Sequence, residues 1–131
     1  MNKAREYLKK VGTFYLATIE GDQPRVRPFG AVAEYNDKIY LCTSNAKNCF
    51  KQMQINPKIE ISACGKDDTW IRISGEVVVD SSDDAREAML IANPGLRNLY
   101  SIGDGIFEVL YFTKATATIY YYKTDPEVFS F

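Results

Sequence analysis

The sequence contains no histidine. Without imidazole, a Ser-His-Asp triad, a Cys-His dyad, a histidine-ligated metal and a proximal histidine for haem are all excluded. The cysteines, Cys42, Cys49 and Cys64, are odd in number and form no C-x-x-C pair, which argues against a disulfide framework and a zinc site. We therefore predict no metal site, and we expect any chemistry to use a bound cofactor or to proceed without imidazole.

Strong net charge and long apolar runs are also lacking. The 16 basic and 17 acidic residues leave a formal net charge of −1, so no overall field attracts nucleic acid or an anionic membrane. No apolar run approaches the roughly 20 residues of a membrane span, and the N-terminal MNKAREYLKKVG has no apolar core of signal-peptide type. The sequence predicts a cytoplasmic protein that binds neither nucleic acid nor membrane.

The chain has enough apolar material for one core. Its 131 residues are 46% hydrophobic and 13% aromatic, which predicts a single domain over 1–131. The apolar periodicity predicts a short helix that ends at Gly12, a second helix over 45–54 capped by Ser44 or Asn45, and a third between Ser82 and Asn93. Strands are predicted over 13–19, 25–35, 38–43, 58–64, 69–80, 106–112 and 115–123.

These strands follow one another as hairpins, which is typical of an antiparallel sheet. Asn36-Asp37 and Thr113-Lys114 are predicted to be turns, and Gly75 within a long strand indicates a bulge or a bend where the sheet closes on itself. With about six main strands, the pattern favours a mainly β fold, a small antiparallel barrel with helices on its rim. Strands 14–19 and 106–112 are apolar on both faces, which predicts a homodimer.

Basic side chains gather at one place in this arrangement. Arg25 and Arg27 are two residues apart on a strand, so both leave the same face, and Lys47 follows at a turn from strand to helix. Spare N–H groups at a helix start also bind anions, so the cluster indicates a phosphate site. The alternative interpretation is that the arginines are the solvated face of an edge strand and that Lys47 is an ordinary surface lysine.

The chain also resembles a known family. FYLATIEGDQPRVRPFG, then YLCTSNAKN, a helix ending in NP and a hairpin through WIRISGEV are similar in order and spacing, over 13–80, to the pyridoxamine 5′-phosphate oxidase-like, FMN-binding split-barrel proteins. This resemblance implies a homodimer of six-stranded antiparallel split β-barrels with peripheral helices. It also implies two FMN molecules, one in each cleft between the subunits.

The resemblance assigns roles to individual positions. The implied cofactor-binding residues are Arg27, Pro28, Phe29, Gly30, Ala31, Thr43, Ser44, Lys47, Asn48 and Trp70. Among them, the backbone of 28–31 would face the isoalloxazine edge, and Lys47 and Asn48 would bind the phosphate. The chain ends in TDPEVFSF and lacks the basic and histidine residues with which the true oxidase binds pyridoxal, so oxidation of vitamin B6 is not expected.

Several residues near this site also have an ordinary structural interpretation. Trp70 is the only tryptophan and could be a core or interface anchor, and Cys42 has no neighbour in the sequence that would activate its thiol. Tyr120-Tyr121-Tyr122 alternate across a strand, which favours one core face and one dimer face over a nucleic-acid platform. The segment 93–100 is either a loop over the cleft or a connector.

The functional prediction is an FMN-binding oxidoreductase whose flavin exchanges hydride with a nicotinamide or a small organic substrate. No catalytic side chain is predicted, because the cofactor carries the chemistry. Three alternatives remain open: a deazaflavin-dependent reductase on the same fold, a flavin carrier or sensor without turnover, and a cofactor-free dimeric interaction module.

Overall fold

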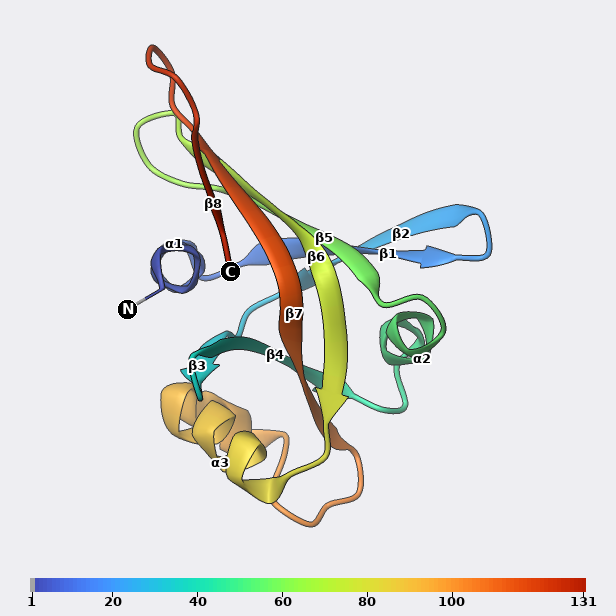
Figure 1. Cartoon of the computed structure of the whole chain (residues 1–131). Helices are drawn as coiled ribbons and strands as arrows, with labels where there is room; N and C mark the ends of the chain where they lie inside the picture. Colours follow the sequence, from blue (N-terminus) through green and yellow to red (C-terminus); the bar gives the residue numbers. More distant parts are fainter. Residues whose placement is uncertain (1) are drawn as a thin grey trace.

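A computed structural model describes residues 2–131 of the protein as one antiparallel sheet with helices around it (Figure 1). The elements in chain order are α1 (Lys3–Val11), β1 (Phe14–Glu20), β2 (Gln23–Phe29), β3 (Ala33–Tyr35), β4 (Lys38–Ser44), α2 (Asn48–Ile55), β5 (Lys58–Cys64), β6 (Trp70–Asp80), α3 (Asp83–Ala92), the 3₁₀ helix η1 (Pro94–Asn98), β7 (Phe107–Tyr120) and β8 (Glu127–Ser130). The strand order is β2-β1-β5-β6-β7-β4-β3, and β8 pairs with β7. The predicted mainly β antiparallel fold with peripheral helices is confirmed.

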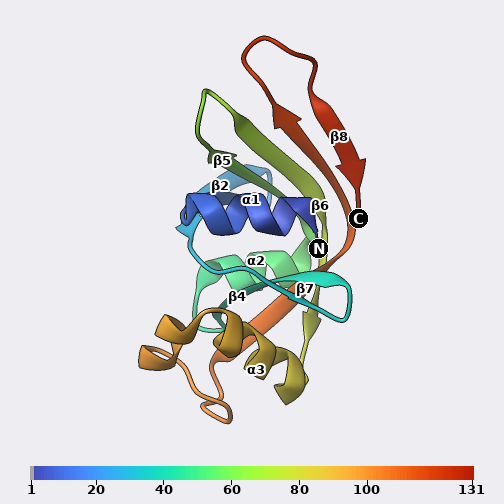
Figure 2. The same ribbon diagram turned by 90° about the vertical axis from the view of Figure 1, so that its left-hand side faces the viewer.

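The helices lie around this curved sheet, with α1 and α2 over one face and α3 over the other face of β4 and β7. Figure 2 shows α1, α2 and α3 following one another from top to bottom, with η1 continuing from the end of α3. Lys3 of α1 forms an ion pair with Glu127 of β8, which ties the two ends of the chain together. Within residues 2–131, no helix has the length and apolar character needed to cross a membrane.

The predicted turn at Thr113-Lys114 is wrong, because β7 runs without interruption from Phe107 to Tyr120. Lys114 pairs with Glu76 of β6, but the next pair joins Phe112 to Val77, so Thr113 is an extra residue in the ladder. This is a β-bulge, which bends a strand without ending it. The first half of β7 pairs with β4 and the second half with β8, so one strand serves both parts of the sheet.

Gly75 lies beside this bulge, as its position in the sequence predicted. A Cβ atom at Gly75 would overlap the carbonyl oxygen of Lys114 on the neighbouring strand. Only glycine allows the two backbones to come this close. The bend and the glycine are therefore parts of one device that curves β6 and β7 together.

The predicted continuous strand over 25–35 is also wrong. The chain leaves β2 after Phe29 and begins β3 at Ala33, and these two strands lie at opposite ends of the strand order. β2 pairs with β1, whereas β3 pairs with β4. The segment 30–32 therefore crosses from one end of the sheet to the other, and the expected strand is the two strands β2 and β3. The sequence also did not predict β8, so the sheet has eight strands where about six main strands were expected.

Two apolar cores lie on either side of β4 and β7. The barrel core lies under α1 and α2 and includes Leu8, Phe14, Leu16, Ile39, Leu41, Phe50, Ile61, Ile73 and Leu110. The α3 core lies between α3 and the other face of β4 and β7, and includes Ala31, Tyr40, Cys42, Met89, Leu90, Phe107 and Val109. β1 differs from β4, because Phe14 and Leu16 are buried whereas Tyr15 between them is 51% exposed. Among residues 2–131, only one face of β1 is thus fully covered.

We expect Gly75→Ala to lower the free energy of unfolding by about 1 to 3 kcal/mol, because the new methyl group must push β7 away from β6 at the bulge. Urea unfolding followed by circular dichroism measures this change. Gly95→Ala is the matched control, since a Cβ at Gly95 meets nothing within 4 Å. Equal stability of the two variants would contradict the close approach at Gly75.

Candidate functional site

Four segments that are distant in the sequence meet around a pocket of about 600 Å³, which we call the α2 pocket. They are the link from β2 to β3, the end of β4, the start of α2 and the corner between α3 and η1. The lining residues are Arg27, Pro28, Phe29, Gly30, Ala31, Cys42, Thr43, Lys47, Cys49, Ala92, Asn93, Pro94, Gly95, Leu96, Leu99 and Tyr100. The volume falls within the range of small-molecule sites.

The first N–H groups of α2 have no side chain as a hydrogen-bond partner. The helix begins at Asn48 with Lys47 as its N-cap, and not at Asn45 as the sequence predicted. A turn over residues 44–47 precedes the helix. In this turn the Lys47 N–H donates to the Ser44 carbonyl (3.1 Å) and the Ala46 N–H donates to Ser44 Oγ (3.2 Å). No side chain caps the helix and no acidic residue lies in its first turn. Its N–H groups and positive dipole end are therefore available to an anion.

The α2 pocket is lined by positive and neutral side chains alone. Arg27 and Lys47 carry its charge, and no aspartate or glutamate is among its lining residues. Lys47 takes part in no ion pair with any of residues 2–131. An anionic ligand would therefore be favoured here, and a cationic one would find no partner.

Arg27 lines the pocket with a guanidinium group that is already held by the protein. Its Nη1 donates to Thr18 Oγ1 (2.7 Å) and its Nη2 donates to Gln52 Oε1 (2.8 Å). Thr18 and Gln52 are both buried, so the arginine connects β2 to β1 and α2 from within. Arg25 does not line the pocket and forms an ion pair with Glu20 (2.9 Å). The two arginines thus have different environments.

The fold brings most of the implied cofactor-binding residues to this pocket. Arg27, Pro28, Phe29, Gly30, Ala31, Thr43 and Lys47 line it. Ser44 forms the turn before α2, and Asn48 is the first residue of that helix. Trp70 does not line the pocket of its own chain, because it begins β6 and stacks on Tyr120 with ring centroids 4.1 Å apart.

The opposite wall of the pocket was only partly foreseen from the sequence. The segment 93–100, left open as a loop over the cleft or a connector, supplies Asn93 to Leu96, Leu99 and Tyr100 to the lining. Cys42 and Cys49 also line the pocket. No local motif marks these residues, because only the packing of α3 against β4 and β7 brings them to the start of α2.

The pocket thiols are buried and unactivated. Burial raises the pKa of Cys42 to about 12, although the nearby Lys47 acts to lower it. The Cys49 sulfur lies 3.5 Å from Thr43 Oγ1. Among the residues that the structure describes, no cluster of His, Cys, Asp or Glu could hold a metal ion. The structural interpretation of Cys42 fits the burial of its thiol better than a redox role does.

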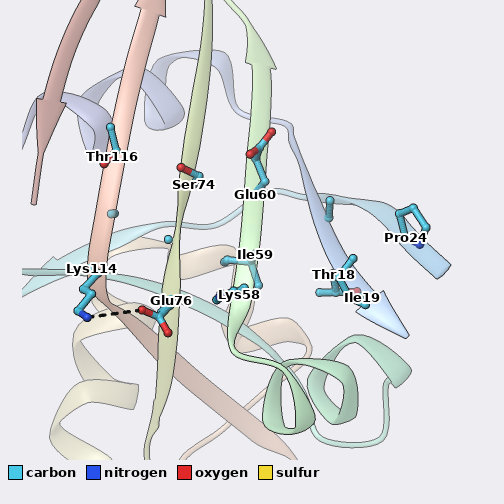
Figure 3. A pocket seen from close by; sticks show the side chains of 13 residues that line it. Thr18, Ile19, Pro24, Lys58, Ile59, Glu60, Ser74, Glu76, Lys114 and Thr116 are labelled. Atoms are coloured by element: carbon cyan, nitrogen blue, oxygen red, sulfur yellow. Dashed lines mark ion pairs between the residues drawn. The ribbon is translucent and has the colours of Figure 1, made fainter. Parts of the chain in front are cut away.

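A second hollow of about 440 Å³ lies on the outer face of the sheet, across β1, β5, β6 and β7 (Figure 3). Its charges are balanced, with Lys58 and Lys114 against Glu60 and Glu76, and Lys114 lies 4.0 Å from Glu76. This outer groove therefore offers no excess of charge to a small ion. The α2 pocket is the stronger candidate for a ligand site.

The sequence and the fold are both similar to those of known proteins. The sequence profile of the pyridoxamine 5′-phosphate oxidase family matches residues 1–118. The chain belongs to this family. The resemblance noted from the sequence is confirmed.

Several solved structures are similar to this chain. A NimC/NimA family protein from Clostridium acetobutylicum is 56% identical, with a TM-score of 0.97 over 98% of this chain and 90% of that one. General stress protein 26 from Bacillus anthracis is 18% identical, with a TM-score of 0.71 over 99% of this chain and 100% of that one. A heme binding protein from Mycobacterium smegmatis is 15% identical, with a TM-score of 0.70 over 99% of this chain and 59% of that one. The last two share the fold alone, and no curated protein matches the chain.

The thiol environments predict unequal reactivity. We expect iodoacetamide to label Cys64 in the native protein, because its side chain is exposed, and to leave the buried Cys42 and Cys49 unlabelled. Mildly alkaline pH should not change this for Cys42, because a pKa of about 12 keeps the thiol protonated. Peptide mass spectrometry identifies the labelled residues, and Cys64→Ser is the control. Rapid labelling of Cys42 would contradict the neutral, buried pocket wall.

Proposed function

We propose that the protein is an FMN-binding oxidoreductase that holds the phosphate of FMN between Lys47 and the start of α2. The observation that carries this proposal is the combination of an unpaired lysine and an uncapped helix start on a pocket that no carboxylate lines. A phosphate monoester is close to doubly charged at neutral pH, and it needs both a cation and several N–H donors.

The other pocket residues suit the rest of the cofactor. The segment 28–31 would lie along the edge of the isoalloxazine ring, and Thr43 and Ser44 would approach it from the end of β4. Arg27 would contribute its charge from a fixed position, because Thr18 and Gln52 already hold its guanidinium group. When bound, FMN supplies hydride exchange with a nicotinamide or a small organic compound, and the protein supplies binding and orientation.

Oxidation of pyridoxamine phosphate is not the activity that we propose, although the family carries that name. The C-terminal segment is used structurally, since β8 pairs with β7. Glu127 in this strand accepts a hydrogen bond from the Tyr121 hydroxyl (2.9 Å) and pairs with Lys3. β8 itself carries no basic side chain for a pyridoxal phosphate.

The visible spectrum of protein purified without added cofactor distinguishes the alternatives. Flavin bands that are bleached by a reduced nicotinamide support the oxidoreductase. Flavin bands that a reduced nicotinamide leaves unchanged support a carrier or sensor. A released deazaflavin, identified by mass, would indicate the reductase that uses this cofactor. A Soret band would replace the proposal with haem binding, as in the relative from Mycobacterium smegmatis. A colourless protein that takes up none of these would favour the interaction module.

We expect Lys47→Ala to weaken FMN binding about ten- to hundredfold, because a charge-assisted hydrogen bond contributes about 1.5 to 3 kcal/mol. Riboflavin has no phosphate, so its affinity should stay within about twofold of wild type, well below the effect of a lost charge-assisted bond. Quenching of flavin fluorescence measures both affinities. Arg27→Ala should weaken FMN too, and it should also lower stability because buried Thr18 and Gln52 each lose one hydrogen bond and keep only the bonds they make to each other and to Glu20.

Lys51→Ala is the matched control for this experiment. Lys51 is an exposed lysine on the same helix, one turn beyond the pocket, so its removal changes the net charge equally. It should leave the affinity for FMN unchanged. The phosphate assignment is wrong if Lys47→Ala weakens FMN and riboflavin equally, or if it weakens neither.

We also propose that the protein is a homodimer whose subunits meet on the outer face of the sheet. Ala17, Glu60, Ser74 and Thr116 lie opposite one another in a row across β1, β5, β6 and β7, and all line the outer groove (Figure 3). Tyr15, two residues before Ala17, is 51% exposed beside this row. A second subunit would cover such a surface, since small side chains allow close packing and tyrosines are frequent in interfaces.

Trp70 supports the same arrangement. Its indole lies outside the α2 pocket of its own subunit, so a contact with flavin requires the pocket of the partner. Arg72 lies over the Trp70 ring, 5.2 Å from the centroid, and fixes the aromatic pair with Tyr120 on the exposed side of β6 and β7. This stack would be a contribution of one subunit to the site of the other.

We expect sedimentation to show a dimer for the wild type and a monomer for Thr116→Arg, because a buried, unpaired guanidinium group costs several kcal/mol. Asn98→Arg is the control, since Asn98 is exposed on η1 and lines neither hollow. A stable wild-type monomer at micromolar concentration would rule out the dimer. A Thr116→Arg dimer would rule out this face as the interface.

A further inference from the structure

The wall of the α2 pocket that faces Lys47 carries a tyrosine in a fixed position. The Tyr100 N–H donates to the Leu96 carbonyl (2.8 Å), which closes the turn after η1. Its ring stacks on buried Phe107, with centroids 4.7 Å apart and ring planes 24° apart. The Asn93 side-chain amide donates to the Val32 carbonyl (3.0 Å) and anchors the beginning of the same wall. The position of the Tyr100 ring is thus set by packing before any ligand binds.

Tyr100 lines the pocket, and its hydroxyl group makes no hydrogen bond with any of residues 2–131. Burial raises the pKa of Tyr100, and the neighbouring Cys42, Asp104 and Cys49 raise it further. The phenol therefore stays protonated at neutral pH and can donate a hydrogen bond. The Thr43 hydroxyl is less free, since it lies in contact with the Cys49 sulfur (3.5 Å).

The chemistry of the pocket restricts what this hydroxyl can meet. No carboxylate lines the pocket, so an ammonium or amine substrate would lose its hydration without gaining an acceptor. Leu96 and Leu99 flank Tyr100 in the lining and suit an apolar, planar body. A carbonyl oxygen on a planar, apolar ligand would accept a hydrogen bond from the Tyr100 hydroxyl.

Resting on the proposed FMN site, we propose that Tyr100 binds the substrate, and that the substrate is a small planar carbonyl compound of the quinone class whose oxygen accepts the Tyr100 hydroxyl. Bound FMN in its reduced form would supply a hydride to the substrate, which would leave negative charge on this oxygen. A hydrogen-bond donor at that oxygen would stabilise the charge as it develops. A proton from water would complete the hydroquinone, and a hydride from a reduced nicotinamide would restore the cofactor.

The first test measures binding without turnover. Tyr100→Phe removes only the hydroxyl and keeps the stack on Phe107. Acetophenone and ethylbenzene are the probes, because they differ in the carbonyl oxygen, and perturbation of the oxidised flavin spectrum reports their affinities. Tyr100→Phe should weaken acetophenone about tenfold, as expected for one hydrogen bond, and leave ethylbenzene unchanged. Tyr35→Phe, a tyrosine outside the pocket, should change neither affinity.

The second test measures turnover of tetramethyl-p-benzoquinone with NADH. We expect Tyr100→Phe to lower kcat/KM about 100- to 1,000-fold, in the range of one lost donor to a developing negative charge, while the affinity for FMN stays unchanged. Weaker FMN binding in Tyr100→Phe would mean that the hydroxyl serves the cofactor and would overturn the proposal. Unchanged kcat/KM and unchanged discrimination between the two probes would overturn it as well.

These outcomes separate the inference from the function on which it rests. Wild-type protein that binds no FMN would refute the proposed function, and the role of Tyr100 with it. FMN-loaded protein that treats acetophenone and ethylbenzene alike, in wild type and variant, would refute the role of Tyr100 alone.

Discussion

The burial of β4 and β7 on both faces is the constraint on which the structure depends. Ile39 and Leu41 of β4 face the barrel core, whereas Tyr40 and Cys42 between them face the α3 core. A one-residue shift of such a strand would exchange the two sets of side chains between two closely packed cores of different shape. These two strands are therefore fixed, and the other elements pack around them.

The position of the α2 pocket follows from this constraint. β4 ends at Ser44, where the buried strand must release the chain into the turn before α2. The α3 core brings the end of α3 and the start of η1 to the same place, because Ala85, Met89 and Leu90 cover the outer side of β4 and β7. The pocket lies where the barrel core and the α3 core both end. The N–H groups at the start of α2 take part in no strand pairing and are available to a ligand there.

Rigid surroundings matter for the chemistry that we propose. Lys47 lies at a helix start that the buried β4 positions, and Tyr100 lies on a wall that Phe107 of β7 supports. Both groups are thus connected to the same two strands. A site that draws its charged and neutral donors from fixed elements can orient a cofactor and a substrate without a catalytic side chain of its own. This suits a chain without histidine.

The family and the fold class could be read from the sequence with little ambiguity. Alternating apolar residues predicted most strands, and the ordered motifs around Arg27 and Lys47 identified the family that the profile over 1–118 confirms. Gly75 also marked the bend correctly, because a glycine inside a strand has few other uses. These features depend on local chemistry, which the sequence contains in full.

Other features were decided only by tertiary structure. Thr113-Lys114 resembles a turn in the sequence, yet β6 pairs with β7 on both sides of it and keeps the strand continuous through a bulge. The strand over 25–35 is broken because its two halves pair with strands at opposite ends of the sheet. Tyr100 joins the pocket because α3 packs on the far side of β4 and β7. In each case long-range pairing or packing overrides local propensity. A short segment of sequence does not show which distant residues it will contact.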